Sequence, residues 1–431
     1  MLKNPDRSNE FRIDDFYKNY LKGPQVFKNR DALDPSYIPE DLPHRDEEIE
    51  QIASRTACSL RGNAPSNFLC YGRTGTGKTA TIRFVSQKLA KYANKDQPWW
   101  IYINCSIVST PYRILAHIYN TIAGEEKIPP TGLPKDVIFK KLLGLLDYKV
   151  KNSICFLVLD EIDLLKDSNE VLYDLTRLNE SLDSCRTCLI GISNQLNFKE
   201  NLDPRAMSSL GKDHIIFPVY DAKELGDILE SRSSIAFCED ALKEGVISLC
   251  AALAAKENGD ARKALQLLRK AGEIAERSHN KTVSRAHVNK AQDELEREKE
   301  IDYIKGMPLQ AQLVLTAVYL ISKYSKERII VSGDIYEVHM ELTNKSPGTR
   351  TLTRRRISDY INELTLAGII SAKKRSMGYY GRTKVIHLNI DMSLLERILG
   401  EIKKIKPLLD YKPVLIQKNK VRINQNVFRK L

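Results

Sequence analysis

The stretch YGRTGTGKT, residues 71–79, is a glycine-rich loop of the pattern GxxxxGK[ST]. Its glycines lack a Cβ, so the backbone can curl around an anion with its N–H groups pointing inward and adopt positive φ angles. Lys78 brings a positive charge to the β and γ phosphates, and Thr79 offers a hydroxyl to Mg²⁺. The stretch therefore predicts a site for ATP or GTP. The expected loop contacts are Gly72, Thr74, Gly75, Thr76, Gly77, Lys78, Thr79 and Ala80.

The segments on either side of this loop favour a strand before it and a helix after it. Residues 67–71 are apolar, and residues 80–90 carry apolar side chains at helical spacing. A helix that begins at the loop directs the positive end of its dipole at bound phosphates. The loop thus lies at the strand-to-helix junction that phosphate binding requires, and a chance glycine-rich turn is the alternative.

An apolar stretch that ends in acidic residues, ICFLVLDEID, occupies residues 154–163. Its continuous apolar character is typical of a strand buried on both faces, in the interior of a sheet. Ligands gather at the carboxyl ends of such strands. Asp160 is expected to hold Mg²⁺ through water, and Glu161 to orient or deprotonate the water that attacks the γ-phosphate. An acidic helix start is the alternative.

Two further polar residues stand at positions suited to sensing a γ-phosphate. Asn194 follows the apolar segment 187–193 and is expected to hydrogen-bond the γ-phosphate or the attacking water, although Asn is also a common turn residue. Arg262 begins an amphipathic helix in GDARKAL, residues 259–265. Its charge opposes the helix dipole, so an anion is expected nearby, and a plain surface arginine is the alternative.

Strand-like and helical segments alternate through the first two hundred residues, which is typical of a parallel sheet covered by helices. We expect an α/β sheet domain with a helical lid, followed by an α+β domain. Residues 221–297 have helical spacing throughout and form the lid, and Met307-Pro308 marks the next boundary. The expected elements are the strands 67–71, 99–104 (buried), 154–159 and 187–193 and the helices 80–90, 111–123 and 136–146.

The net charge of +12 is concentrated in the last third of the chain. Residues 301–431 contain 24 Lys and Arg against 11 Asp and Glu, a balance of +13, which leaves −1 for residues 1–300. A near-neutral sheet domain joined to a strongly basic domain indicates a polyanionic partner, and nucleic acid is the expected one. A solvated basic face is the alternative.

The pattern after Leu309 describes a winged helix-turn-helix. Its elements are the helix 309–323, strand 328–331, helices 335–342 and 351–367, and strands 369–373 and 385–388. The third helix carries Arg354, Arg355 and Arg356 for the major groove of DNA. Its core-facing positions are Leu352, Ile357, Ile361 and Leu364. The wing lays basic side chains on phosphates and tyrosines on sugars, unless the domain serves protein contacts instead. The expected wing residues are Lys373, Lys374, Arg375, Tyr379, Tyr380, Arg382 and Lys384.

Composition favours a cytoplasmic protein without a membrane partner, and the expected nucleic-acid partner would make it nucleoid-associated. No apolar run approaches the roughly 20 residues of a membrane span, and the amino terminus is charged where a signal peptide would be apolar. The eight cysteines are scattered, mostly in apolar segments, as small buried hydrophobes would be. Cys185 and Cys188 form a CxxC without a second ligand pair, so buried thiols are expected rather than a zinc site.

In this order, YGRTGTGKT, LVLDEID, GISN and GDARKAL resemble the Walker A, Walker B, sensor 1 and sensor 2 motifs of AAA+ ATPases. Two further segments, LPHRDE at 42–47 and LDPR with SSL at 202–210, are similar to the replication initiators of archaea. Those initiators are relatives of the largest subunit of the origin recognition complex and of the helicase-loading cell division control protein. The resemblance covers nearly the whole chain, and it implies an AAA+ sheet domain, a helical lid and a winged helix.

The resemblance also implies roles for individual residues. Pro43, His44 and Arg45 would line the adenine and ribose side of the pocket. Arg205 would act as an arginine finger on the nucleotide of a neighbouring subunit, and a structural arginine paired with a carboxylate is the alternative. The insertion after the strand at 99–104 touches DNA in relatives. Its candidates here are Thr110, Arg113 and the loop 130–132.

The whole sequence predicts an initiator that binds double-stranded origin DNA under the control of ATP or ADP and Mg²⁺, with slow hydrolysis as a switch. By resemblance it recruits or loads the replicative helicase and self-associates on DNA. The expected domains are 1–215 for the sheet domain, 216–300 for the lid and 301–431 for the winged helix. One alternative is an AAA+ DNA motor such as a branch-migration helicase, with rapid turnover. The other is a winged-helix regulatory ATPase, which would carry sensor repeats.

Overall fold

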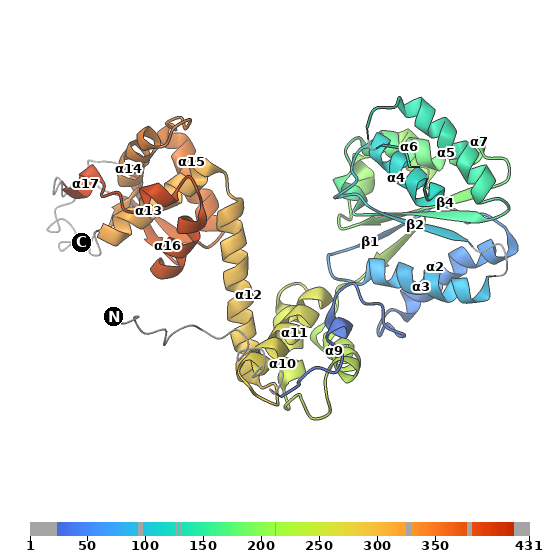
Figure 1. The fold of residues 1–431 in the computed structure, drawn as a ribbon, viewed down its shortest axis with the longest axis horizontal. Helices are drawn as coiled ribbons and strands as arrows, with labels where there is room; N and C mark the ends of the chain where they lie inside the picture. Colours follow the sequence, from blue (N-terminus) through green and yellow to red (C-terminus); the bar gives the residue numbers. More distant parts are fainter. Residues whose placement is uncertain are drawn as a thin grey trace, which may run out of the picture. The chain divides into compact units, whose positions relative to one another are not determined.

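The computed structural model describes residues 24–93, 98–125, 127–129, 131–211, 213–324, 329–376 and 382–417. The chain forms two compact units, Met1–Gln292 and Asp293–Leu431 (Figure 1). The division falls inside helix α12 (Arg285–Gly306), and the first unit contains both the sheet and the expected lid. The finer boundaries at 215 and 300 stay predictions.

The first unit is built on a five-stranded parallel sheet. In spatial order its strands are β2 (Trp99–Asn104), β3 (Ile154–Asp160), β4 (Arg186–Ser193), β1 (Phe68–Gly72) and β5 (His214–Phe217). β3 pairs with a strand on each side and is buried along its apolar length, as its sequence predicts. β2 was expected to be buried and lies instead at the edge, where Trp99 is 37% exposed.

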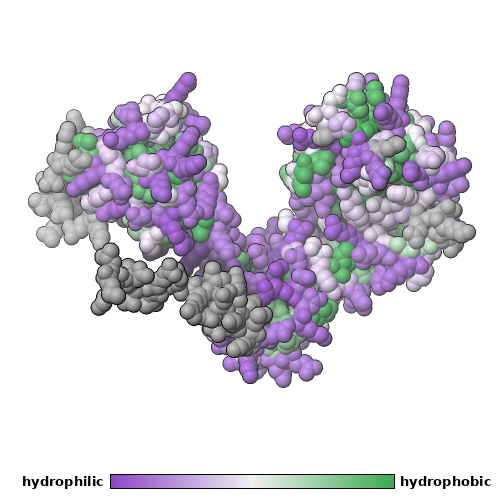
Figure 2. All heavy atoms as spheres, in the orientation of Figure 1, coloured by the Kyte–Doolittle hydropathy of each residue, from purple (hydrophilic) through white to green (hydrophobic). Residues whose placement is uncertain are grey.

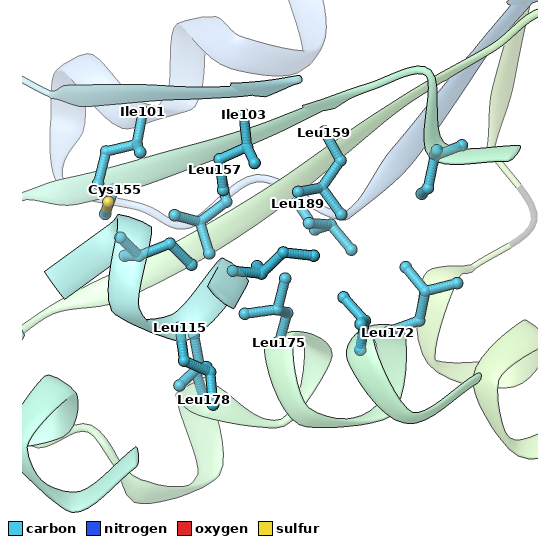
Figure 3. Close-up of a cluster of buried hydrophobic side chains, with 14 of the residues drawn as sticks. Ile101, Ile103, Leu115, Cys155, Leu157, Leu159, Leu172, Leu175, Leu178 and Leu189 are labelled. Carbon is cyan, nitrogen blue, oxygen red and sulfur yellow. The ribbon is translucent and has the colours of Figure 1, made fainter. Parts of the chain in front are cut away.

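Helices cover both faces of this sheet (Figure 1). One face is covered by α2 (Asp46–Thr56) and α3 (Lys78–Tyr92). The other is covered by α4 (Pro111–Ala123), α5 (Lys135–Lys149), α6 (Ser168–Thr176), α7 (Leu178–Ser181) and α8 (Pro204–Leu210). Successive residues of a strand point to opposite faces, so Leu157 and Leu159 pack with Leu175 on one side (Figure 3) while Phe156 and Val158 pack on the other.

Three helices follow the sheet as the lid. They are α9 (Ala222–Ala236), α10 (Val246–Lys256) and α11 (Ala261–Arg277). The sequence predicts helix throughout this region, but the chain breaks between these helices. Gly259 and His279 adopt left-handed backbone angles shortly after α10 and α11 end, and Gly245 adopts one directly before α10 begins.

A segment before the sheet domain packs on the lid, a contact that the sequence does not reveal. Phe27 pairs with Phe237 as an isolated antiparallel bridge, and their ring centroids lie 4.8 Å apart. Arg30 Nη2 lies 2.6 Å from Glu276 Oε2 of α11. Residues 24–34 therefore belong physically to the lid, although they precede the phosphate-binding loop in the chain.

The second unit has the element order of a winged helix-turn-helix. Its parts are α13 (Leu309–Tyr324), β6 (Ile330–Val331), α14 (Ser332–Lys345), α15 (Arg354–Leu366), β7 (Ile370–Ser376) and β8 (Arg382–Leu388), followed by α16 (Met392–Glu401) and α17 (Val414–Gln417). The three strands form an antiparallel sheet. In α15, Ile357, Ile361 and Leu364 are buried and Leu352 packs against the same core, as predicted. The helices after β8 were not foreseen.

Among the described residues, no single helix is long and apolar enough to cross a membrane. The pair α12 and α13 reaches that length and composition only when taken together, across a bend of 118°. α13 is buried from Ala311 to Ile321 inside the core of the second unit, which accounts for its apolar sequence.

We predict a pH-dependent stability from His339 of α14. The side chain is fully buried, its Nε2 pairs with Gln310 Oε1 at 3.0 Å, and burial lowers the pKa of His339 from 6.5 to about 4. The unfolded chain takes up this proton as the pH falls through 6.5, whereas the folded chain does so only near 4, so stability is complete above 6.5 and is lost below it. From pH 7 to pH 5 the free energy of unfolding should fall by about 2 kcal/mol through this group.

Urea titrations followed by circular dichroism at both pH values measure this loss. Other groups also titrate in this range, so the comparison is with His339→Leu, which should lose about 2 kcal/mol less than the wild type. Equal pH dependence of the two proteins would contradict the assignment.

Candidate functional site

The phosphate-binding loop joins β1 to α3, with Gly75 at φ +79° and Gly77 at φ +88°. These left-handed angles are ones that side chains disfavour. Space is also restricted, because a Cβ on Gly75 would lie 1.8 Å from Asp260 Oδ1 and one on Gly77 would lie 2.9 Å from Tyr220 Oη. Both glycines are therefore required by conformation and by the close approach of neighbouring elements.

Lys78 lies at the centre of the site. Its Nζ donates to the carbonyl oxygens of Gly72 and Arg73, each at 2.8 Å, and to Asn194 Oδ1 at 3.0 Å. Burial lowers the pKa of Lys78 to about 8, and the positive charge of Arg262 adds to the effect. The fold thus brings together the loop lysine, the expected sensor Asn194 and the lid residue Arg262.

Thr79 and Asp160 meet as expected. Thr79 Oγ1 donates to Asp160 Oδ2 at 2.8 Å, across the ends of the neighbouring helix and strand. Hydroxyl and carboxylate oxygens are the ligands that Mg²⁺ prefers, and this ion is bound by few protein ligands together with phosphates and water. No cluster of three or more His, Cys, Asp or Glu in the described ranges could hold a metal by itself. The two residues fit a magnesium ion shared with a nucleotide.

The two acidic residues that follow β3, Glu161 and Asp163, differ in backbone conformation and in contacts. Glu161 has φ +57°, a left-handed angle unusual for a residue with a side chain. Such backbone strain is concentrated at functional sites. Asp163, which the sequence reasoning did not select, accepts hydrogen bonds from Ser193 Oγ at 2.9 Å and from the Asn194 amide at 3.0 Å. It fixes the loop that carries Asn194. Its position as the third acidic residue of LDEID, residues 159–163, was the only sequence feature that could have indicated this role.

The lid contacts the loop directly. The Asp260 side chain caps α11 by accepting hydrogen bonds from the backbone amides of Arg262 and Lys263. The backbone amide of Ala261, the first residue of α11, donates to the Gly75 carbonyl oxygen at 3.2 Å. Arg73 Nη1 donates to Asn258 Oδ1 at 3.1 Å. These bonds place Arg262, in the first turn of α11, at the wall of the same cavity as the loop.

That cavity has a volume of about 340 Å³. Its walls include the expected residues Pro43, Gly75, Gly77, Thr79, Ala80, Asp160 and Arg262. They also include residues 35–39 and Asp41 and the lid residues Ile228, Ser231 and Arg232, which no motif indicated. The other expected loop residues are not among its walls. Thr74 is exposed, whereas Gly72, Thr76 and Lys78 are buried, with Thr76 Oγ1 donating a hydrogen bond to the Arg73 carbonyl oxygen.

His44 and Arg45 do not line this cavity, contrary to what the resemblance implied. Arg45 is only 2% exposed, and its guanidinium donates to the carbonyl oxygens of Thr76, His44 and Pro218. His44 has φ +59°, and its Nε2 lies 2.8 Å from Asp227 Oδ2 of α9. Both side chains are held by contacts within the protein, Arg45 by backbone carbonyl groups and His44 by Asp227.

Arg205 is exposed in the first turn of α8. Within the described ranges its guanidinium forms no ion pair and no side-chain hydrogen bond, so the alternative of a carboxylate partner is not seen there. In the insertion, Arg113 is exposed in the first turn of α4, the helix that Thr110 precedes as its N-cap residue. Pro130 lies outside the described residues.

The expected DNA-binding residues lie on two elements of the second unit. Arg354, Arg355 and Arg356 are exposed in the first turn of α15, which Thr353 caps through a bond from the Arg356 amide. Lys373, Lys374 and Arg375 are exposed on β7. Most of the visible face of this unit is hydrophilic (Figure 2). Tyr379, Tyr380 and the side chain of Arg382 lie outside the described part of the chain.

Lys384 differs from the other wing lysines. Its Nζ donates to Ser358 Oγ at 2.9 Å and to Asn362 Oδ1 at 2.8 Å, both on α15. Burial lowers the pKa of Lys384, and the neighbouring charge of Lys374 adds to this. The ammonium group joins β8 to α15, and its expected role as a phosphate contact stays a prediction.

We predict that Gly75→Ala weakens ADP binding at least tenfold, because the new Cβ meets Asp260 and displaces the cap of α11 from the loop. Gly62→Ala is the matched control, since Gly62 also has a positive φ, +75°, but a Cβ added there would meet no atom within 4 Å. Titration with a fluorescent ADP analogue measures both. Equal affinities for the two variants would contradict the close contact.

Comparisons with known proteins agree with this architecture. A family model of the AAA domain matches residues 62–198, the Cdc6 AAA+ ATPase-type lid domain matches 226–293, and the CDC6 C-terminal winged helix domain matches 302–397. Among solved structures, that of the Aeropyrum pernix ORC1 protein in complex with DNA is similar, with a TM-score of 0.74 and 41% identity. The match covers 89% of this chain and 99% of that one. The expected fold class is confirmed.

Curated relatives are similar over nearly their whole length. The ORC1-type DNA replication protein of Pyrococcus furiosus is 47% identical over 406 residues, 93% of this chain and 96% of the relative. ORC1-type DNA replication protein 1 of Methanosarcina acetivorans is 40% identical over 94% of this chain and 98% of the relative. The chain therefore belongs to the family of ORC1-type DNA replication proteins, with an AAA+ domain, a Cdc6-type lid and a winged helix.

Proposed function

We propose that this chain is a replication initiator that binds double-stranded origin DNA under the control of ATP and Mg²⁺. The observation that carries the DNA-binding part is the exposed triplet Arg354, Arg355 and Arg356 in the first turn of α15. The similar ORC1 protein of Aeropyrum pernix was solved in complex with DNA, which supports the same partner here. In this role α15 enters the major groove, and the exposed basic residues of β7 meet the phosphates.

The ATP part of the proposal rests on the residues around Lys78. The loop N–H groups and Lys78 bind the β and γ phosphates, and Arg262 of the lid adds a second cation on the γ-phosphate side. Thr79 and Asp160 would hold Mg²⁺, and the ion would supply positive charge against the phosphates. Glu161 orients the attacking water and accepts its proton, and Asn194, fixed by Asp163, reports the γ-phosphate to the loop that follows β4.

Hydrolysis in this scheme is slow and serves as a switch. Arg205 is exposed and forms no ion pair within the described ranges, so it is available to the nucleotide of a neighbouring molecule. An arginine supplied in this way stabilises transition-state charge only after the molecules associate. A single chain would then hold its ATP for a long time, and association on DNA would trigger turnover. Recruitment of the replicative helicase, in the nucleoid, rests on the family alone.

We predict that Arg355→Ala with Arg356→Ala weakens binding to origin duplex by ten- to a hundredfold. Loss of two basic contacts should also reduce the slope of log affinity against log salt by about 2. Fluorescence anisotropy over a salt series measures both quantities, with random duplex as competitor.

Arg397→Ala with Lys404→Ala is the matched control, since both are exposed basic residues of the same unit, on and after α16, and the pair removes the same two charges. Equal losses in the two proteins would mean that only bulk charge matters. Failure of origin fragments to compete better than random duplex, or rapid DNA-stimulated turnover with unwinding of forked DNA, would favour a motor and contradict the initiator.

We also predict that an equal mixture of Lys78→Ala and Arg205→Ala hydrolyses ATP on DNA while each variant alone does not. Lys78→Ala lacks the loop cation but retains Arg205, and Arg205→Ala has the converse defect, so one chain completes the site of the other. A phosphate-release assay measures the recovery. No recovery, with both variants folded and bound to DNA, would mean that Arg205 does not act across subunits.

A further inference from the structure

Arg45 lies where the two connections between the sheet domain and the lid meet. One connection runs through residues 39–45 into α2, and the other runs through residues 218–221 from β5 into α9. Arg45 Nη1 donates to the His44 carbonyl oxygen at 2.7 Å and Nη2 to that of Pro218 at 2.8 Å. One side chain therefore holds both connections at the same point.

The same guanidinium also holds the phosphate-binding loop. Arg45 Nε donates to the Thr76 carbonyl oxygen at 2.9 Å. In a trans peptide the C=O and the following N–H point in opposite directions. Fixing the Thr76 carbonyl towards Arg45 therefore turns the Gly77 N–H to the opposite side, which is the side on which a loop of this kind binds phosphate. The Ala261 amide does the same for the Gly75 carbonyl.

Tyr220 extends this contact to the lid. The Arg45 guanidinium carbon lies 3.7 Å from the centre of the Tyr220 ring. On its other sides Tyr220 meets Gly77 and Gly259, since a Cβ on Gly77 would lie 2.9 Å from its Oη and one on Gly259 would lie 2.3 Å from its carbonyl oxygen. Gly259 directly precedes Asp260, the cap of α11. The stack thus runs from the loop, through Arg45 and Tyr220, to the start of the helix that carries Arg262.

Burying the charged guanidinium group of Arg45 costs free energy, so its burial needs a physical explanation. Arg45 is 2% exposed, and its nearest carboxylate oxygen, Glu48 Oε1, is 3.6 Å away, longer than a strong ion pair. A buried charge is retained where its donors are satisfied in fixed directions. Only arginine presents a planar fork of donors that can meet three carbonyl oxygens at once, and lysine has no such geometry.

We propose that Arg45 is a positioning residue that couples the shape of the phosphate-binding loop to the position of the lid. It orients the Gly77 N–H for phosphate and fixes both connections to the lid, so a nucleotide that tightens the loop also tightens the lid. The coupling acts with ADP as well as ATP, because it involves no contact with a γ-phosphate. This inference rests on the proposed nucleotide site.

The test compares Arg45→Met and Arg45→Lys with the wild-type full chain, in the absence of DNA. ADP affinity is measured with a fluorescent analogue, and amide hydrogen exchange is followed with and without ADP. Arg45→Met leaves three carbonyl groups without their donor, so ADP should bind ten- to a hundredfold more weakly. The protection that ADP confers on residues 258–263 should be lost, while residues 154–160 of β3 exchange as in the wild type. Arg45→Lys should show an intermediate loss.

Arg61→Met is the control, since Arg61 is an exposed arginine after α2, and it should behave as the wild type. Wild-type affinity in both Arg45 variants would overturn the inference, and so would weaker affinity with normal ADP protection of 258–263. If Arg45→Met does not fold, Tyr220→Leu removes the stacked ring and should lose the same protection, and its failure to do so would equally overturn the inference. Absence of ADP binding by the wild type would instead contradict the proposed function.

Discussion

The orientation of a few backbone carbonyl groups constrains the whole nucleotide site. A glycine-rich loop can present consecutive N–H groups to an anion only if its carbonyl groups point away and find donors elsewhere. Lys78 donates to the carbonyls of Gly72 and Arg73, the Ala261 amide to that of Gly75, and Arg45 to that of Thr76. Each donor belongs to a different element, so the loop has its shape only when helix, lid and connection are all in place.

Strand order explains why the remaining polar residues meet the loop. β4 lies between β3 and β1, so the residue that follows β4 lies between the acidic end of β3 and the loop after β1. Asn194 therefore reaches Lys78 on one side, while Asp163 accepts from its amide on the other. A different strand order with the same motifs would separate these groups, and the chemistry of the site thus depends on topology as much as on residue type.

The sequence predicts what is local and misses what is made by distant segments. The loop and the exposed arginines of α15 follow from short patterns whose neighbours in the chain are also neighbours in space. Thr79 and Asp160 are 81 residues apart, but each stands at a position that its own short motif identifies. The pairing of Phe27 with Phe237 joins segments far apart in the chain and leaves no such pattern. Hydrogen bonds to backbone carbonyl groups leave no sequence pattern either, because a residue of any type can supply the carbonyl group. The sequence for that reason did not reveal the bond of Arg45 to the Thr76 carbonyl group or that of Lys384 to α15.

The two candidate sites of this chain share one electrostatic arrangement. Lys78 begins α3, Arg262 lies in the first turn of α11, and Arg354 to Arg356 form the first turn of α15. A cation at a helix N-terminus is disfavoured by the dipole, by about 0.3–1 kcal/mol for an exposed one. An anion placed there relieves that repulsion and gains the helix N–H groups as donors. At Lys78, burial and the charge of Arg262 lower the pKa to about 8, so an anion beside this ammonium group would also offset those two effects. Both arrangements are therefore suited to bind ligands with several phosphate groups. We expect a nucleotide in the first unit and a nucleic acid backbone in the second.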